Sequence, residues 1–266
     1  MHASKPSVLA ESVGPFVGVF SESVTHTLGF GSTKRRQAAK TFWLAERTLE
    51  GDLFIQALNK NMVPVGDRRR ISEERFLEGY CPEPDLYMSV VRPRMRELEE
   101  AVRRGDDHRA LDEIFSAEVE YKRALRIDVD EIRANFGLGL TYLAQSDTEK
   151  ARYVFGKLVA LDAAFLPAHK HLFNEFGIAL RKNRMHGEAV LYYTRARELG
   201  PDDDHLLYNL ARAHFEQRQW GESRSWAQRA LDINPGLAEA ASLLRALGRQ
   251  APAFPSPRLA LPQDAA

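Results

Sequence analysis

Two basic clusters contain the residues of this chain that are best suited to bind an anion. They are Lys34, Arg35 and Arg36, and Arg68, Arg69 and Arg70. A guanidinium can donate two parallel hydrogen bonds to a phosphate or a carboxylate. Arginines beside a small β unit could therefore hold a nucleotide, a nucleic acid or an acidic protein. A solvated loop is the simpler interpretation of the same residues, and the anionic partner is the alternative.

Motifs for catalysis are missing from the sequence. It has no G-x-S-x-G, no P-loop, and no G-x-G-x-x-G after a strand. His169 and His171 are two residues apart, so a helix would point them to different sides. The run Asp202–Asp204 is explained by capping at the start of a helix, and the one cysteine, Cys81, excludes an internal disulfide. We therefore predict no enzyme, no cofactor and no metal site.

A pattern of small and aromatic residues repeats along the second half of the chain. Gly139 has a counterpart in Gly177, 38 residues later, and another in Ala211 after 34 more. Gly105 fits an earlier copy. Each of these four positions is followed by a second pair of small or aromatic residues: Ala117 and Tyr121, Ala151 and Phe155, Ala189 and Tyr193, and Ser223 and Ala227. Such a period indicates a unit of two helices that is repeated along the chain.

This spacing resembles the tetratricopeptide repeat, with its pattern W-x2-L-G-x2-Y…A-x3-F…P. The resemblance covers roughly residues 98–238. It implies a mainly α fold, a right-handed α-solenoid of about four helix-turn-helix repeats in which the small residues lie where helices cross. The helix expected over 237–247 would cap the last repeat with a polar outer face, to which Glu239, Ser242 and Arg245 could contribute. The resemblance also implies that the protein holds another protein.

The family further implies where that partner would bind, because the first helices of its repeats line a concave surface. Counting along these helices in the third and fourth repeats places nine residues on this surface: His171, Asn174, Arg181, Lys182, His205, Tyr208, Asn209, Arg212 and Phe215. Asn209 and Arg212 match residue types with which the family holds a peptide backbone or a carboxylate. Together the nine form a basic and aromatic surface, which suits a partner segment with acidic residues and apolar anchors.

The N-terminal part of the chain lacks the repeat. Two β-prone runs, Thr41–Arg47 and Leu53–Leu58, flank a glycine-containing turn and predict a hairpin, followed by a loop over 59–70 and a short helix that begins after Ser72. We predict four regions: a flexible arm over 1–33, a small hairpin-containing region with a short helix over 34–95, the repeat array with its capping helix over 96–248, and a disordered proline-rich tail over 249–266.

Composition narrows the function classes. The 37 Lys and Arg residues balance 37 Asp and Glu residues, and zero net charge argues against a general nucleic-acid binder. No apolar run is long enough for a membrane span, and the apolar stretch near the N-terminus does not match a secretory signal, so we expect a cytoplasmic protein. We predict a non-enzymatic adaptor that binds a partner segment in its concave groove. The alternative is a ligand-responsive regulator, whose basic N-terminal region binds an anionic ligand and whose repeats relay this to a partner.

Overall fold

The computed structural model describes residues 14–28, 35–199 and 203–250. It divides into two compact units, residues 1–134 and 135–266. Most of the predicted tail and the first part of the predicted arm lie outside the described residues.

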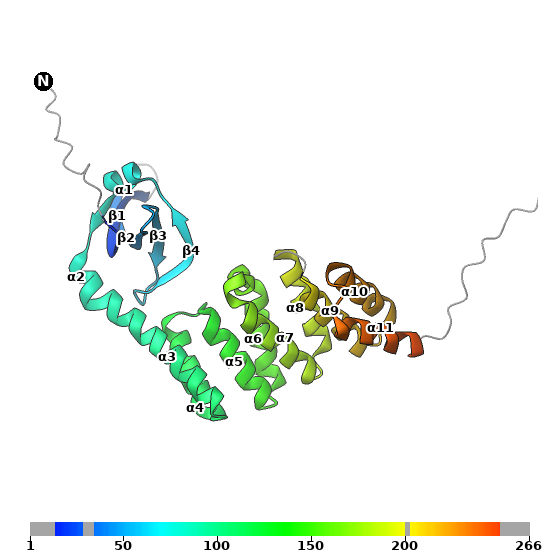
Figure 1. Ribbon diagram of the computed structural model, residues 1–266. Coiled ribbons are helices and arrows are strands. Elements are labelled where there is room, and N and C mark those ends of the chain that lie inside the picture. The colour runs from blue at the N-terminus through cyan, green and yellow to red at the C-terminus, as the bar shows by residue number, and fades with distance from the viewer. Residues whose placement is uncertain (1–13, 29–34, 200–202, 251–266) are drawn as a thin grey trace, which may run out of the picture. The chain divides into compact units, whose positions relative to one another are not determined.

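A five-stranded antiparallel sheet begins the first unit (Figure 1). The strand order is β4-β3-β2-β1-β5. The strands are β1 (Phe16–Leu28), β2 (Arg35–Arg47), β3 (Leu53–Leu58), β4 (Pro64–Arg70) and β5 (Tyr80–Pro82). The predicted hairpin is β2 and β3, and its turn contains Gly51 at φ 89°, a conformation that glycine adopts without steric cost.

Two predictions for this region were wrong, because β1 lies within the predicted arm and β4 within the predicted loop. The strand β1 pairs with β2, the next strand in the sequence, and with β5, whose residues lie about 60 positions away. The pairing with β5 leaves no local signal in the residues of β1. The strand β4 forms an edge of the sheet. Charged side chains are common on edge strands because they discourage further pairing. The arginines of β4 were therefore interpreted as part of a loop, whereas they belong to an edge strand.

One face of the sheet packs on the short helix α1 (Glu73–Gly79). The predicted cap is confirmed, since the hydroxyl of Ser72 accepts a hydrogen bond from the amide of Arg75 at 3.4 Å. The core between α1 and the sheet contains buried Ala45, Leu53, Ile55, Phe76 and Tyr80. A short helix α2 (Pro84–Leu86) and a π-helical turn η2 (Tyr87–Val91) then lead into the first long helix.

Paired helices make up the rest of the described chain, and they confirm the predicted α-solenoid of four repeats with a capping helix. The pairs are α3 (Arg92–Ala110) and α4 (Ile114–Ile127), α5 (Ile132–Ala144) and α6 (Thr148–Ala160), α7 (Lys170–Lys182) and α8 (His186–Leu199), and α9 (Asp204–Glu216) and α10 (Trp220–Ile233). The cap is α11 (Ala238–Gln250). Two 3₁₀ turns, η3 (Asp162–Phe165) and η4 (Pro167–His169), occupy the longer connection before α7.

Glycines allow the helices to approach each other closely, as the repeat pattern predicted. A Cβ atom at Gly177 would lie 2.5 Å from Cζ of Tyr193 in the second helix of the same repeat, and one at Gly105 would lie 2.6 Å from the ring of Tyr121. Gly139 differs in its neighbour, because its nearest contact is the ring of Phe176 in the next repeat, at 2.6 Å. Small residues at these positions therefore set the spacing both within a repeat and between repeats.

Aspartates cap two of the helices. At α6, Asp147 accepts a hydrogen bond from the Lys150 amide at 3.1 Å, and Ser146, at φ 59°, lies in the preceding turn. At α9, Asp203 accepts from the Leu206 amide at 3.0 Å, as the capping interpretation predicted.

The carboxylate of Asp203 is expected to make stability sensitive to acid. Burial raises its pKa, but hydrogen bonds from Lys170 and from the Leu206 amide outweigh this and leave the pKa below its ordinary value. The contribution is therefore present above the unfolded-state pKa, about 3.9, and is lost as pH falls through the folded-state pKa. Asparagine caps a helix equally well but does not titrate. Urea unfolding of Asp203→Asn should therefore lose less stability between pH 5 and pH 3 than wild type, and equal losses would contradict the assignment.

Candidate partner-binding groove

A pocket of about 520 Å³ lies between the first helix of the fourth repeat, α9, and the capping helix α11. The α9 wall consists of Tyr208, Arg212 and Phe215, which are three or four residues apart and so share one helix face. The α11 wall consists of Ala238, Glu239, Ser242, Leu243 and Ala246. The two walls combine one cation, one anion, two aromatic rings and small or apolar side chains.

Arg212 is only loosely held by its neighbours. Its Nε lies 3.3 Å from Oε1 of Glu216, and its Nη1 lies 3.3 Å from the hydroxyl of Tyr208. Both distances are beyond the usual range for such hydrogen bonds. Burial lowers the pKa of Arg212, but Tyr208 and Glu216 raise it overall, so the guanidinium stays charged.

Glu216 is shared between two arginines. The same Oε1 also accepts a hydrogen bond from Nη1 of Arg181, whose side chain is only 16% exposed, compared with 42% for Arg212. His186 approaches the other carboxylate oxygen at 3.2 Å. Because one carboxylate faces two guanidiniums, the cluster carries excess positive charge, and Arg212 is the more accessible of its two cations.

The aromatic residues of the groove are positioned by the core behind it. The rings of Phe215 and Trp220 meet edge to face with centroids 5.2 Å apart. Tyr208 and Phe215 also pack on a cluster of buried residues: Ala211, Ala227, Leu243 and Leu247. These contacts give the pocket an apolar base made from α9, α10 and α11.

Of the nine predicted groove residues, Tyr208, Arg212 and Phe215 line this pocket. Arg181 instead serves as the buried partner of Glu216. His171, Lys182 and His205 are exposed, and Asn174 and Asn209 are half-buried, but these five lie outside the pocket.

The α11 wall was not predicted. Glu239 and Ser242 were expected on the outer face of the cap, but they line the pocket. The reason is that α11 packs against α9 and α10 as the first helix of a further repeat would, so one of its polar faces turns to the groove. The amphipathic pattern of 237–247 was the available signal, although a single helix does not reveal which polar face is covered.

Among the predicted basic residues, the structure describes the contacts of Arg68 and Arg70. Lys34 lies outside the described residues, and Arg35 and Arg36 begin β2. On β4, Arg68 lies 2.8 Å from Glu46 and over the ring of Phe54, and Arg70 pairs with Asp52. The side chains of Arg68 and Arg70 are 45% and 72% exposed. Glu46 on β2 and Asp52 in the turn before β3 therefore already balance two of these charges.

Replacing Arg68, Arg69 and Arg70 together by serine should have little effect on folding. Exposed ion pairs contribute about 0–1 kcal/mol each, and both acidic partners remain solvated. We expect a loss of about 1 kcal/mol or less in urea unfolding. A loss of several kcal/mol would show that the arginines of β4 are structural residues.

The described ranges contain neither a candidate metal site nor a membrane-spanning helix. No three His, Cys, Asp or Glu side chains there come together as metal ligands. In the same ranges, no helix is both long and apolar enough to cross a membrane.

Residues 174–238, which include most of α7 and all of α8, α9 and α10, match the family model of the tetratricopeptide repeat. The chain contains tetratricopeptide repeats. The matched segment contains the α9 wall of the groove. No curated protein matches the chain.

Several solved structures are similar to the repeat protein. PilF of Pseudomonas aeruginosa is 18% identical, with 58% of this chain and 69% of that chain covered and a TM-score of 0.46. MamA is 20% identical, with coverages of 57% and 81% and a TM-score of 0.47. YrrB, described as a tetratricopeptide repeat protein with an unusual peptide-binding site, is 23% identical, with coverages of 56% and 75% and a TM-score of 0.43.

Proposed function

We propose that this repeat protein is a non-enzymatic, cytoplasmic adaptor that holds an acidic, partly apolar segment of another protein between α9 and α11. The repeat family supports the general role of an interaction scaffold. The observation that carries the specific proposal is the pair Arg181 and Arg212, which share the single carboxylate of Glu216 beside the rings of Tyr208 and Phe215.

Binding would exchange weak contacts for stronger ones. A carboxylate of the partner would accept two parallel hydrogen bonds from Arg212, and Glu216 would keep its bond to Arg181. An apolar side chain of the partner would fill the space between Phe215 and Leu243. Burying such an anchor contributes about 1.5–3 kcal/mol.

The walls also set an orientation. Glu239 stands on the α11 wall, opposite Arg212. An acidic residue of the partner would therefore lie against α9, and a neutral or basic residue would lie against α11. Asn174 and Asn209 are half-buried, and the proposal gives their amides the role of contacting the backbone of a segment that continues toward the third repeat.

Selection from a random peptide display library against the full-length protein tests this function without knowledge of the partner. We expect enrichment of peptides in which an aspartate or glutamate neighbours an aromatic or aliphatic residue. A parallel selection against Arg212→Glu should lose the acidic consensus, while selection against Arg224→Glu, on α10, should keep it. Enrichment of basic peptides, or the same consensus on all three proteins, would reject the groove as the binding site.

A further inference from the structure

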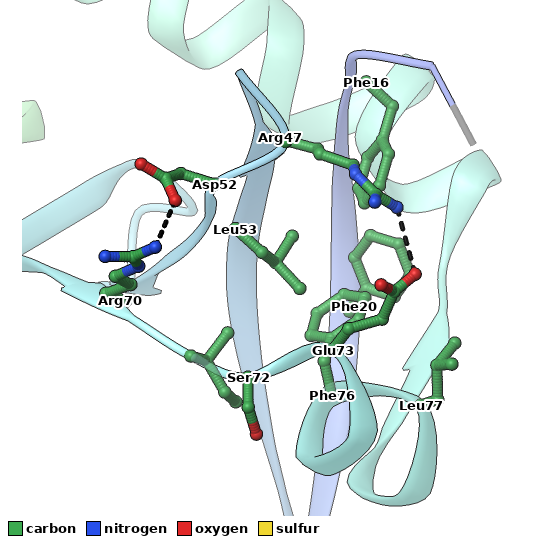
Figure 2. A pocket seen from close by; sticks show the side chains of 12 residues that line it. Phe16, Phe20, Arg47, Asp52, Leu53, Arg70, Ser72, Glu73, Phe76 and Leu77 are labelled. Carbon is green, nitrogen blue, oxygen red and sulfur yellow. Dashed lines mark hydrogen bonds and ion pairs between the residues drawn. The ribbon is translucent and has the colours of Figure 1, made fainter. Parts of the chain in front are cut away.

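A second and larger pocket, of about 700 Å³, lies in the N-terminal unit between the sheet and α1 (Figure 2). Its apolar lining includes Phe16, Phe20, Leu53, Phe76 and Leu77. The ring centroids of Phe20 and Phe76 are 4.7 Å apart, and that of Phe16 lies 5.9 Å from Phe20. Pockets of this size with a mostly apolar lining and a few polar groups are typical of small-molecule sites.

Two ion pairs form the polar part of the lining. Arg47 donates a hydrogen bond to Glu73 at 3.0 Å, and Arg70 pairs with Asp52. Figure 2 shows the first pair beside the phenylalanine rings and the second on the other side of Leu53. A ligand that enters this pocket would thus place an apolar body against the rings and meet charged groups with its polar end.

Of the charged side chains that line the pocket, Arg47 is the best placed to bind a ligand. This residue ends β2 and is held in the ladder opposite Phe16 on β1 and Leu53 on β3. Its side chain is only 18% exposed, whereas that of Glu73 is 52% exposed. Among the described residues, the Arg47 guanidinium has a single hydrogen-bond partner, Glu73, which accepts from Nη1 of Arg47.

The N–H donors of Arg47 that make no hydrogen bond to a described residue favour a ligand with hydrogen-bond acceptors. A guanidinium carries five N–H donors and no acceptor, so Nε and Nη2 of Arg47 remain available to an anionic group. The carboxylate of Glu73 is 52% exposed, so solvent screens its attraction for a cation, and it lies in the first turn of α1, where negative charge is favourable. A cationic ligand would therefore gain less from Glu73 than an anionic ligand would gain from Arg47.

We propose that this pocket binds a small amphiphilic acid, with its apolar body against Phe16, Phe20 and Phe76 and its anionic head on Arg47. Arg70 also lines the pocket, but its side chain is 72% exposed and paired with Asp52. This site is separate from the groove of the repeats and does not depend on the adaptor function.

Calorimetric titration of the full-length protein with dodecanoate, dodecylamine and dodecanol, each below its aggregation threshold, tests the class of ligand. The three probes share an alkyl chain and differ only in the charge of the head. We expect dodecanoate to bind at least tenfold more tightly than the other two. The proposal is wrong if dodecanoate does not bind, or if the amine or the alcohol binds as tightly.

Two substitutions at the same ion pair distinguish ligand binding from a structural effect. Arg47→Gln removes the cation and should weaken dodecanoate binding about tenfold. Glu73→Gln leaves Arg47 without its internal competitor and should tighten binding. Because both variants break the same ion pair, a merely structural role would move both affinities in the same direction, and that result would overturn the proposal.

The pair Arg68 and Glu46 provides the matched control, since it lies on the same sheet but outside the pocket lining. Arg68→Gln removes one positive charge, as Arg47→Gln does, and should leave the dodecanoate affinity unchanged. An equal loss in Arg68→Gln would mean that the net charge of the sheet, rather than this pocket, attracts the acid.

Discussion

Replacing Gly139 by leucine is expected to destabilise the repeat array by roughly 1–3 kcal/mol or more. Even a Cβ atom at this position would lie 2.6 Å from the ring of Phe176 and 3.2 Å from Val154. Both side chains are buried, so neither can move aside without disturbing the packing of α5 on α6 and α7. The measurement is the urea unfolding midpoint followed by far-ultraviolet circular dichroism.

Gly156 provides a control with the same chemical change. It lies within α6, is exposed, and a Cβ atom added there would meet nothing within 4 Å. Because leucine favours the helix more than glycine does, by up to about 1 kcal/mol, Gly156→Leu should leave stability unchanged or increase it. If the two leucine variants unfolded at the same urea concentration, the assignment of Gly139 to a helix crossing would be wrong.

Replacing Arg212 by alanine is expected to weaken binding of a selected acidic peptide at least tenfold, with no change in the melting temperature of the free protein. A tenfold loss corresponds to about 1.4 kcal/mol. Losing one partner of a buried charged pair costs about 2–5 kcal/mol, and the partial exposure of Arg212 places its contribution toward the lower end. Isothermal titration calorimetry measures the difference.

Arg224 on α10 is the matched control for this prediction. It is exposed, and its guanidinium makes one long contact, 3.5 Å, to the carbonyl oxygen of Leu247. Arg224→Ala should bind the peptide as wild type does. Equal affinities for wild type and Arg212→Ala would move the partner to another surface of the array.

The repeats were predictable because their signals are local. Gly177 and Tyr193 lie in neighbouring helices of one hairpin, so the spacing between them along the chain reports a contact in space. A short connection keeps such partners at a constant sequence distance in each repeat. The same regularity predicted which helices form the array and that a single capping helix follows the last repeat.

The sheet was predicted only at the hairpin of β2 and β3, although β1 also pairs with the next strand in the sequence, β2. The hairpin of β2 and β3 has a glycine turn, whereas β5 pairs with β1 across about 60 residues of intervening chain. Long-range pairing leaves no period in the sequence. The pocket behind α1 depends on this pairing, and nothing in the spacing of Phe16, Arg47 and Phe76 indicates that they meet.

Three of the predicted groove residues line the pocket between α9 and α11, and the α11 wall was missed. Tyr208, Arg212 and Phe215 follow from the helix period and the family resemblance. Sharing of Glu216 between Arg181 and Arg212 depends on how α7 packs against α9, and the second wall depends on how α11 covers the last repeat. Both are properties of helix packing, which the residue pattern of one helix does not determine.

A double-mutant cycle between Arg212 and the acidic residue of a selected peptide tests the central claim most directly. Four calorimetric titrations combine wild type or Arg212→Ala with the peptide or its acid-to-alanine variant. If the two groups touch, each single change should weaken binding at least tenfold, and the second change should then cost little. Losses that simply add would contradict the proposed contact between the partner's acid and Arg212.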